Sequence, residues 1–198
     1  MALPSGYTQL EYIQSSGTQY IDTGFKPNQD TRVVAKAKYT QPSTPAYLFG
    51  ADAGSGQAGF SFGSANGNLR QFYNKTSTYF QSGLSFTDPI TIDANKNVCS
   101  IDDTYTVNGT YATFSPGYSM YLFAANRAGS IYGICTATIY SCQIYNNGTL
   151  VRDYVPCKYG NSIGLWDKVN STFYGNSGTD SFTAGYKGGK SQWLDYIQ

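Results

Sequence analysis

The sequence predicts an all-β protein, folded as an antiparallel two-sheet β-sandwich of the jelly-roll kind. Three observations predict this class. Strand-favouring residues (Tyr, Thr, Phe and Val) are plentiful, whereas Glu11 is the only glutamate among 198 residues. Short apolar or alternating runs recur at a spacing of about 8–12 residues, with Gly, Asn, Ser and Pro between them. No long stretch shows the 3.6-residue periodicity of an amphipathic helix.

The clearest strand is expected at residues 31–40. Its odd positions from Val33 to Tyr39 are apolar, and its even positions include Arg32, Lys36 and Lys38. Because side chains of a strand alternate between two faces, this pattern indicates a strand with one face in the core and one in solvent.

The next strands are expected at residues 46–51, 59–63 and 69–74, joined by glycine-rich turns, and then at 90–93, 98–102 and 105–108. The pair Asn108-Gly109 is typical of a hairpin turn. Further strands are expected at the strongly apolar residues 118–125 and at 131–145, the longest β-like run. Asn146-Asn147-Gly148 then predicts a turn into a returning strand at 149–155.

The composition excludes several classes of function. The chain contains no histidine, which removes the Ser-His and Cys-His nucleophiles, the imidazole base and histidine-ligated zinc. Its net charge is +1 with no basic cluster, so nucleic acid is not an expected partner. No stretch approaches the roughly 20 apolar residues that span a bilayer, so membrane insertion is not expected. The N-terminus has no signal-peptide pattern, so either the protein is not exported by that route or the sequence starts inside a longer chain.

The four cysteines are Cys99, Cys135, Cys142 and Cys157. None are spaced C-x-x-C, so a zinc ribbon is not expected, and four cysteines in a chain of this length do not make a disulfide scaffold. Free, partly buried thiols are favoured over disulfides.

One domain is expected over residues 1–185, followed at 186–198 by a linker or the start of a following repeat. Residues 194–198 (LDYIQ) repeat residues 10–14 (LEYIQ), and residues 186–191 are rich in Gly, Lys and Ser, as flexible linkers are. Chance similarity in a tyrosine-rich chain explains the repeat equally well, so both interpretations stay open.

Four blocks of the sequence resemble concanavalin A-like (LamG-type) lectin and glucanase jelly-roll domains. They are LPSGYTQLEYIQSSGTQYIDTGF (3–25), YLFAANRAGSIYG (121–133), IYSCQIYNNGTLVRDYVPCKYGNSIGLWD (139–167) and NSTFYGNSGTDSFTAG (170–185). Domains of this kind occur in phage tail and structural proteins and in surface proteins of gut Firmicutes. The resemblance implies a two-sheet sandwich whose first and last strands pair.

The third block carries three local predictions. Tyr140, Cys142 and Ile144 are assigned to one core-facing side of a strand, because they alternate along it. The adjacent Arg152 and Asp153 are expected to take part in a cross-strand ion pair. Residues 164–167, which include Trp166, are expected to form a turn plugged by an aromatic ring.

Enzymatic activity is not expected. A retaining glycosidase needs two carboxyl groups about 5–5.5 Å apart. Glu11 is the only glutamate, and the adjacent Asp102 and Asp103 would point to opposite faces of a strand. The catalytic glutamate pair of the glucanases is therefore absent, and a glycoside hydrolase is the least favoured class.

No cofactor is expected, although calcium stays open. Asp22, Asp30, Asp52 and Asp102 lie in or near predicted loops, where carboxylates can bind Ca²⁺. No D-x-D-x-D-G run exists, and aspartate as a turn former is favoured over aspartate as a ligand.

A carbohydrate site is the favoured alternative. Sugars bind to aromatic rings surrounded by amide, carboxylate and guanidinium groups, and such residues gather at several places in the chain. The candidate ligand-binding residues are Asn66, Asn68, Arg70, Tyr73, Tyr111, Asn126, Arg127 and Trp166. Because a sandwich core must also be filled with rings, about three of the eight are expected to reach a ligand.

The sequence therefore predicts a non-catalytic carbohydrate-binding or adhesion module whose partner is a glycan or host cell-surface polysaccharide. Its expected setting is a virion, as part of a phage tail or receptor-binding protein, or the cell surface, as part of a larger bacterial protein. The main alternative is a structural virion or assembly domain that binds only other protein chains.

Overall fold

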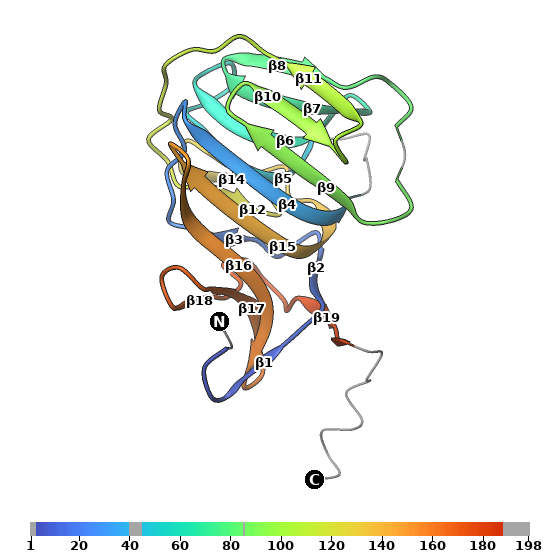
Figure 1. Ribbon diagram of the computed structural model, residues 1–198, viewed down its shortest axis with the longest axis vertical. Coiled ribbons are helices and arrows are strands. Elements are labelled where there is room, and N and C mark those ends of the chain that lie inside the picture. The colour runs from blue at the N-terminus through green and yellow to red at the C-terminus, as the bar shows by residue number, and fades with distance from the viewer. Residues whose placement is uncertain (1–2, 40–44, 85, 188–198) are drawn as a thin grey trace.

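The computed structural model describes residues 3–39, 45–84 and 86–187 and shows two stacked β-sheets (Figure 1). The larger sheet has eleven strands: β1 (Tyr7–Gln9), β2 (Tyr12–Ser16), β4 (Thr31–Tyr39), β9 (Ile90–Asn95), β10 (Val98–Ile101), β11 (Tyr105–Asn108), β15 (Thr136–Asn146), β16 (Thr149–Tyr159), β17 (Ser162–Asp167), β18 (Thr172–Tyr174) and β19 (Thr183–Gly185). Its main path runs β11-β10-β9-β4-β15-β16-β17-β18, with β1 beside β16 and β2 between β15 and β19.

The smaller sheet has eight strands: β3 (Ile21–Asp22), β5 (Ala46–Asp52), β6 (Gly59–Ala65), β7 (Asn68–Asn74), β8 (Thr76–Tyr79), β12 (Tyr121–Leu122), β13 (Ala125–Arg127) and β14 (Ser130–Tyr132). Its main path runs β14-β13-β5-β6-β7-β8, and β12 joins β5 to β3. The strand pairs of the described residues are antiparallel except for β13 with β5. The predicted all-β sandwich is thus confirmed, whereas the jelly-roll connectivity stays a prediction.

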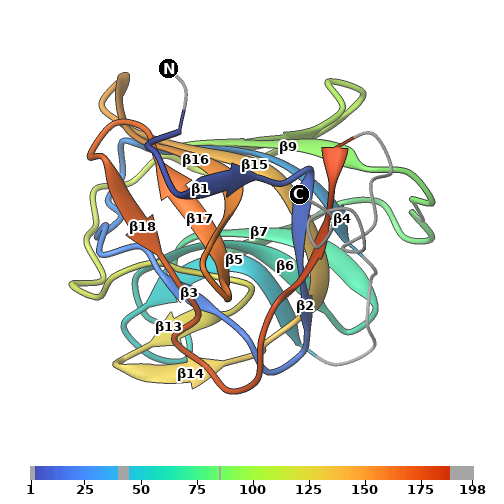
Figure 2. The same cartoon turned by 90° about the horizontal axis from the view of Figure 1, so that it is seen from below.

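The core lies between the two sheets, which Figure 2 shows as two layers seen edge-on. On β4 the predicted alternation is confirmed, since Val33 and Ala37 are fully buried and Lys36 is exposed. The facing strands β5 and β6 contribute Phe49 and Phe60, whose ring centroids lie 6.2 Å apart. Burial of each such ring stabilises the fold by about 1.5–3 kcal/mol. This apolar layer fixes which residues of the smaller sheet must face outward.

Turn chemistry explains one hairpin and one wrong prediction. Asn147 (φ 47°) and Gly148 (φ 77°) form the expected tight turn between β15 and β16. The hairpin predicted at Asn108-Gly109 is wrong, because β11 ends there and pairs only with β10. The amide of Gly109 instead donates to the carbonyl of Asn97, and the chain leaves for the smaller sheet.

Two long apolar runs are each divided between elements. Residues 118–125 do not form one strand, because Phe123 has a φ of 66° and separates β12 from β13. Residues 131–145 are divided at Gly133, whose φ is 59°, so β14 belongs to the smaller sheet and β15 to the larger. Both predicted extents are therefore wrong, because apolar composition does not show where a strand is interrupted or where the chain changes sheet.

The third sequence block requires two corrections. A β-bulge between Ile139 and Ser141 shifts the alternation, so Cys142 and Ile144 are buried as predicted but Tyr140 is not in the core. The ring of Tyr140 instead packs on that of Tyr12, with centroids 5.4 Å apart. Residues 164–167 are part of strand β17 rather than a turn.

The last strand pairs near the start of the domain, but its partner is the second strand and not the first, which pairs with β16. Strand β19 pairs with β2, with Thr183 opposite Gln14 and Gly185 opposite Tyr12. Residues 188–198, which include the LDYIQ repeat and most of the predicted linker, lie outside the described residues. All four cysteines are free, as predicted, and they are fully buried where partial burial was expected.

Candidate functional site

The register of the smaller sheet leaves a strip without large side chains on its outer face. Because Phe49, Phe60 and Phe62 occupy the core, the alternate positions of β5 and β6 point outward. The outward positions of β6 are all small, and across the strands Gly50 of β5 lies opposite Ser61 and Gly63 lies opposite Arg70. Larger side chains on the flanking strands stand on either side of this floor, which produces an open cleft.

The cleft has a volume of about 370 Å³. One side is formed by Tyr47, Asp52, Arg127 and Tyr132, from β5, β13 and β14. The other side is formed by Arg70, Phe72, Lys75 and Ser77, from β7, β8 and the turn between them, and Asn66 and the loop at Gly54–Gly56 also contribute.

Glycines let the ring of Tyr47 lie against the floor. A Cβ atom at Gly133 would lie 2.6 Å from Cδ2 of Tyr47, and one at Gly63 would lie 3.0 Å from its Cδ1. The first contact is too close for a real side chain and the second is tight, so glycine at these positions admits the ring. Tyr47 is therefore buried (2% exposed) although it belongs to the outer face.

Arg127 is held by a carboxylate and a ring. Its Nε lies 3.0 Å from Oδ1 of Asp52, which is buried, and its guanidinium carbon lies 3.5 Å from the centroid of Tyr132. Burial acts to lower the pKa of Arg127, but the hydrogen bond and charge of Asp52 outweigh it and raise that pKa. Arg127 is thus a permanently charged and firmly oriented donor.

Arg70 is held differently, by hydroxyl groups and rings. It donates to the hydroxyls of Tyr47 and Ser77, and its guanidinium carbon lies 5.4 Å from the ring centroids of Tyr47 and Phe72. Its Nε is buried and has no hydrogen-bond partner among the described residues. The arrangement offers planar faces and guanidinium donors to a ligand, side by side.

Three of the eight predicted residues line this cleft, namely Asn66, Arg70 and Arg127. Arg127 was expected in a loop after a strand but belongs to β13 itself. Asn68 is nearby on β7, where its amide donates to the carbonyl of Asn66, but it does not line the cleft.

The other four predicted residues lie elsewhere. Asn126 is buried and binds Ser119 and the amide of Gly129, which orders the turn. The hydroxyl of buried Tyr73 donates to the carbonyls of Gln29 and Ala112, and Tyr111 is exposed beside it. Trp166 belongs to the larger sheet.

Sequence reasoning missed four lining residues with the chemistry of a site: Tyr47, Asp52, Lys75 and Tyr132. Tyr47 and Asp52 are five residues apart, so strict alternation would place them on opposite faces. The irregularity between Tyr47 and Phe49 brings both to the outer face, and no local pattern predicts it. Tyr132 could not have been found from a local pattern either, because it reaches the cleft through β14, a strand the sequence did not separate from its neighbour.

The aspartates considered for calcium are scattered over the molecule. Asp52 pairs with Arg127, Asp30 with Lys96, and Asp22 and Asp102 accept hydrogen bonds from backbone amides. Within residues 3–39, 45–84 and 86–187, no three acidic or cysteine side chains are grouped as metal ligands would be.

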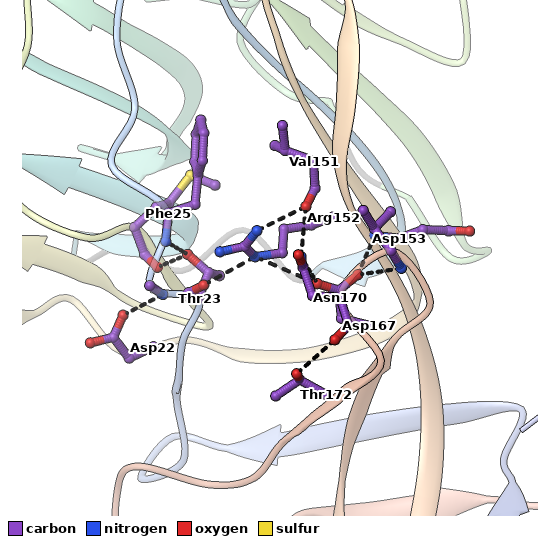
Figure 3. A network of polar contacts seen from close by, with 12 residues as sticks. Asp22, Thr23, Phe25, Val151, Arg152, Asp153, Asp167, Asn170 and Thr172 are labelled. Carbon is purple, nitrogen blue, oxygen red and sulfur yellow. Dashed lines mark hydrogen bonds and ion pairs between the residues drawn. The ribbon is translucent and has the colours of Figure 1, made fainter. Parts of the chain in front are cut away.

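A second polar network lies where β16 and β17 meet the loop after β3 (Figure 3). The fully buried carboxylate of Asp167 accepts hydrogen bonds from the amides of Asp153 and Val169 and from the side chain of Asn170. Arg152 lies 3.6 Å from the same carboxylate and donates to the carbonyls of Thr23 and Val151. The cross-strand ion pairs predicted for Arg152 and Asp153 are therefore made to Asp167 and Lys168.

An aromatic cluster covers part of the outer face of the larger sheet, on β1, β16, β17 and β18. The ring of Tyr7 stacks on Tyr159 at 4.6 Å and packs on Trp166 at 4.8 Å and on Phe173 at 5.9 Å. Tyr159 is half exposed (52%). These rings contact one another and form an apolar patch. The patch differs from the cleft of the smaller sheet, where guanidinium donors lie beside the rings.

No protein-family model matches the chain, and a search of curated proteins found no significant match. The resemblance to concanavalin A-like domains therefore stays a prediction. In the part of the chain that the structure describes, no helix has the length and apolar character that crossing a membrane requires.

Proposed function

We propose that the chain is a non-catalytic carbohydrate-binding module whose ligand occupies the cleft of the smaller sheet. One observation carries the proposal. The sheet brings Arg70, Arg127 and Tyr132 around a floor of glycine and serine, so a flat ligand can approach the strands between rings and guanidinium donors. The cleft's volume of about 370 Å³ falls within the range of ligand pockets, roughly 300–1,000 Å³.

Each part of the cleft matches a feature of a sugar ring. The C–H face of a pyranose stacks on an aromatic ring such as that of the partly exposed Tyr132, at about 0.5–1.5 kcal/mol for a well-placed contact. Sugar hydroxyls and ring oxygens accept hydrogen bonds from guanidinium groups. A single site of this kind binds weakly, and several copies of a module would strengthen binding through effective concentration.

The carboxylates of the cleft support binding without catalysis. Glycoside hydrolysis by the usual mechanism needs two carboxyl groups that flank the scissile bond. The described lining has one carboxylate, Asp52, which is buried and paired with Arg127. An ion-paired carboxylate that also accepts the amide hydrogen of Gly54 at 3.0 Å is poorly suited to act as an acid or nucleophile.

The test is affinity electrophoresis of the full chain through gels that contain soluble polysaccharides of varied composition. We expect retardation by at least one polysaccharide. Tyr132→Ala should weaken it by about 0.5–1.5 kcal/mol, because a stacking face is lost. Tyr159→Ala, which removes an exposed ring from the opposite sheet, serves as the control and should bind as the wild type. Equal binding by Tyr132→Ala, or no retardation across a broad panel, contradicts the proposal.

A protein-binding role is the second candidate, and the aromatic cluster on the larger sheet favours it. Tyr7, Tyr159 and Phe173 offer an apolar surface of the kind found at protein interfaces. The two roles use opposite faces and separate experimentally, because Tyr159→Ala would weaken protein contacts and leave polysaccharide binding intact. The phage-tail or cell-surface setting stays a prediction from the resemblance.

A further inference from the structure

We infer that the ligand of the cleft is an anionic polysaccharide, whose repeating unit carries a carboxylate, phosphate or sulfate group. This inference rests on the proposed function and narrows it from carbohydrate to charged carbohydrate. The charges of the cleft carry the argument, beginning with the partners of the chain's four arginines.

Three arginines have their charge neutralised by an aspartate. Arg32 lies 2.6 Å from Asp93, Arg127 lies 3.0 Å from Asp52, and Arg152 lies 3.6 Å from Asp167. Arg70 is the exception, because it pairs with no carboxylate of the described residues. A chain with only 12 acidic residues nevertheless supplies one to every arginine but this one.

The surroundings of Arg70 make the missing counter-charge significant. The side chain is half-buried between the rings of Tyr47 and Phe72, where the guanidinium is less hydrated than in open water. Its two terminal nitrogens donate only to neutral hydroxyls, and its buried Nε donates to nothing among the described residues. An anion in the cleft would supply the negative counter-charge that Arg70 lacks, and the planar guanidinium group is well suited to bind it.

The whole lining has the same sign. Three cationic side chains, Arg70, Lys75 and Arg127, face one carboxylate, Asp52, which leaves two positive charges in excess. Lys75 is exposed and forms no ion pair with any described residue. The protein as a whole has a net charge of +1, so the excess is local to the cleft rather than a general property of the surface. Such a local field attracts an anionic chain and does not form the extended basic stripe of a nucleic-acid binder.

The experiment compares polymers that differ in charge alone. Binding of the full chain is measured by isothermal titration calorimetry or affinity electrophoresis with polygalacturonate and with its fully methyl-esterified form. Two further arms compare dextran sulfate and dextran phosphate, each with unmodified dextran. These arms identify which anionic group is recognised. We expect at least one charged polymer to bind about tenfold more tightly than its neutral partner, with the preference shrinking as salt rises.

Variants then locate the charge preference. Arg70→Gln and Lys75→Gln should each reduce affinity for the charged polymer severalfold, and by a larger factor than they reduce any affinity for the neutral partner. Lys36→Gln, which removes an exposed cation from the larger sheet, is the matched control and should bind as the wild type. Circular dichroism establishes whether each variant is folded. If Arg70→Gln does not fold, Lys75→Gln still tests the inference, because Lys75 is exposed and its substitution should not disturb the fold.

Each outcome decides between the two proposals. Equal binding of charged and neutral polymers, or a preference for charge that survives Arg70→Gln and Lys75→Gln, overturns the anionic ligand and leaves carbohydrate binding in place. Tighter binding of a single-stranded oligonucleotide than of any polysaccharide also overturns it. No binding of any polysaccharide by the folded protein overturns both.

Discussion

Arg70 and Arg152 are both half-buried arginines of the same sandwich, yet their surroundings differ in one respect. Arg152 lies beside the buried carboxylate of Asp167 and donates to two backbone carbonyls, so its charge is compensated within the chain (Figure 3). Arg70 reaches two hydroxyls and two rings, and no described carboxylate lies beside it. A charged side chain that is paired within the fold contributes to stability, whereas an unpaired one beside a cleft is available to bind a ligand.

The comparison extends to what surrounds each side chain. Around Arg152, the amides of Asp153 and Val169 converge on a carboxylate that is fully buried. A buried carboxylate is costly unless it is hydrogen-bonded and paired. Here two backbone amides and the side chain of Asn170 donate to it, and the guanidinium of Arg152 supplies the opposite charge. Around Arg70 the floor is glycine and serine, which leaves space above the strands. Whether an arginine is paired within the fold or available to a ligand thus depends on the neighbouring residues.

The largest effect is expected from breaking the closed network. Asp167→Ala removes the acceptor of Asn170 and of two backbone amides and leaves the charge of Arg152 uncompensated. The free energy of unfolding should fall by about 3–5 kcal/mol, as it does when one partner of a buried pair is removed. Equilibrium urea unfolding measures this.

Asp153→Ala is the matched control, because Asp153 lies on the neighbouring strand and pairs with the half-exposed Lys168. Its loss should cost at most about 1 kcal/mol. Polysaccharide binding by the folded fraction of either variant should equal that of the wild type. Similar stability losses in the two variants would show that burial and closure do not distinguish these carboxylates.

The buried thiol of Cys142 gives the stability of the fold a dependence on pH. Burial, with a smaller contribution from the charge of Asp153, raises the pKa of the Cys142 thiol to about 12 from an ordinary 9.0. The folded state therefore keeps its proton while the unfolded state loses it, so this thiol's contribution to stability is complete below about pH 9. Above that pH the contribution falls by roughly 1 kcal/mol per pH unit until the folded thiol ionises.

Urea unfolding at a series of pH values from about 8 to 11 measures this contribution. Cys142→Ala is the informative variant, since it lacks the titrating group, although it loses some packing at every pH. Its stability should decline less steeply above pH 9 than that of the wild type. Parallel curves for the two proteins would show that the thiol does not stay protonated in the fold.

Sequence patterns predicted those parts of the fold that depend on local alternation. The alternation of β4 and the Asn-Gly turn before β16 follow from side-chain direction and backbone sterics, which are local properties. The bulge that turns Tyr140 out of the core was not predictable, because it depends on the register with β4. Asn108-Gly109 failed for the same reason, since a turn pair makes a hairpin only where a second strand is available.

The sequence predicted the residue types of the candidate site better than it predicted which residues come together there. Arg70 and Arg127 were identified as polar residues near strands, and they meet across the sheet because β7, β6, β5 and β13 are neighbours. Asn126 precedes Arg127 and is also a polar residue suited to binding a sugar. Strand alternation, however, turns its side chain to the opposite face, where it orders a turn. Strand order and facing are long-range properties, so no local pattern separates these two residues.

The smallest effect is expected at Tyr111, a predicted ligand-binding residue that lies away from the cleft. Its ring is half exposed beside Tyr73, and its hydroxyl lies 3.4 Å from Oδ1 of Asp30, a carboxylate of its own chain. That carboxylate already forms an ion pair with Lys96, so its charge is compensated within the fold, as the charge of Arg152 is. Tyr111→Ala should change the free energy of unfolding by no more than about 0.5 kcal/mol, as exposed substitutions usually do.

Polysaccharide affinity in Tyr111→Ala should also be unchanged within error, in the same electrophoretic assay in which Tyr132→Ala binds more weakly. The two tyrosines differ in surroundings rather than in chemistry: Tyr132 carries the guanidinium of Arg127 at the edge of an open cleft, and Tyr111 touches groups that the fold already uses. A clear loss of affinity in Tyr111→Ala would place the ligand outside the cleft. It would also break the link between an open charge and binding on which the contrast of Arg70 with Arg152 depends.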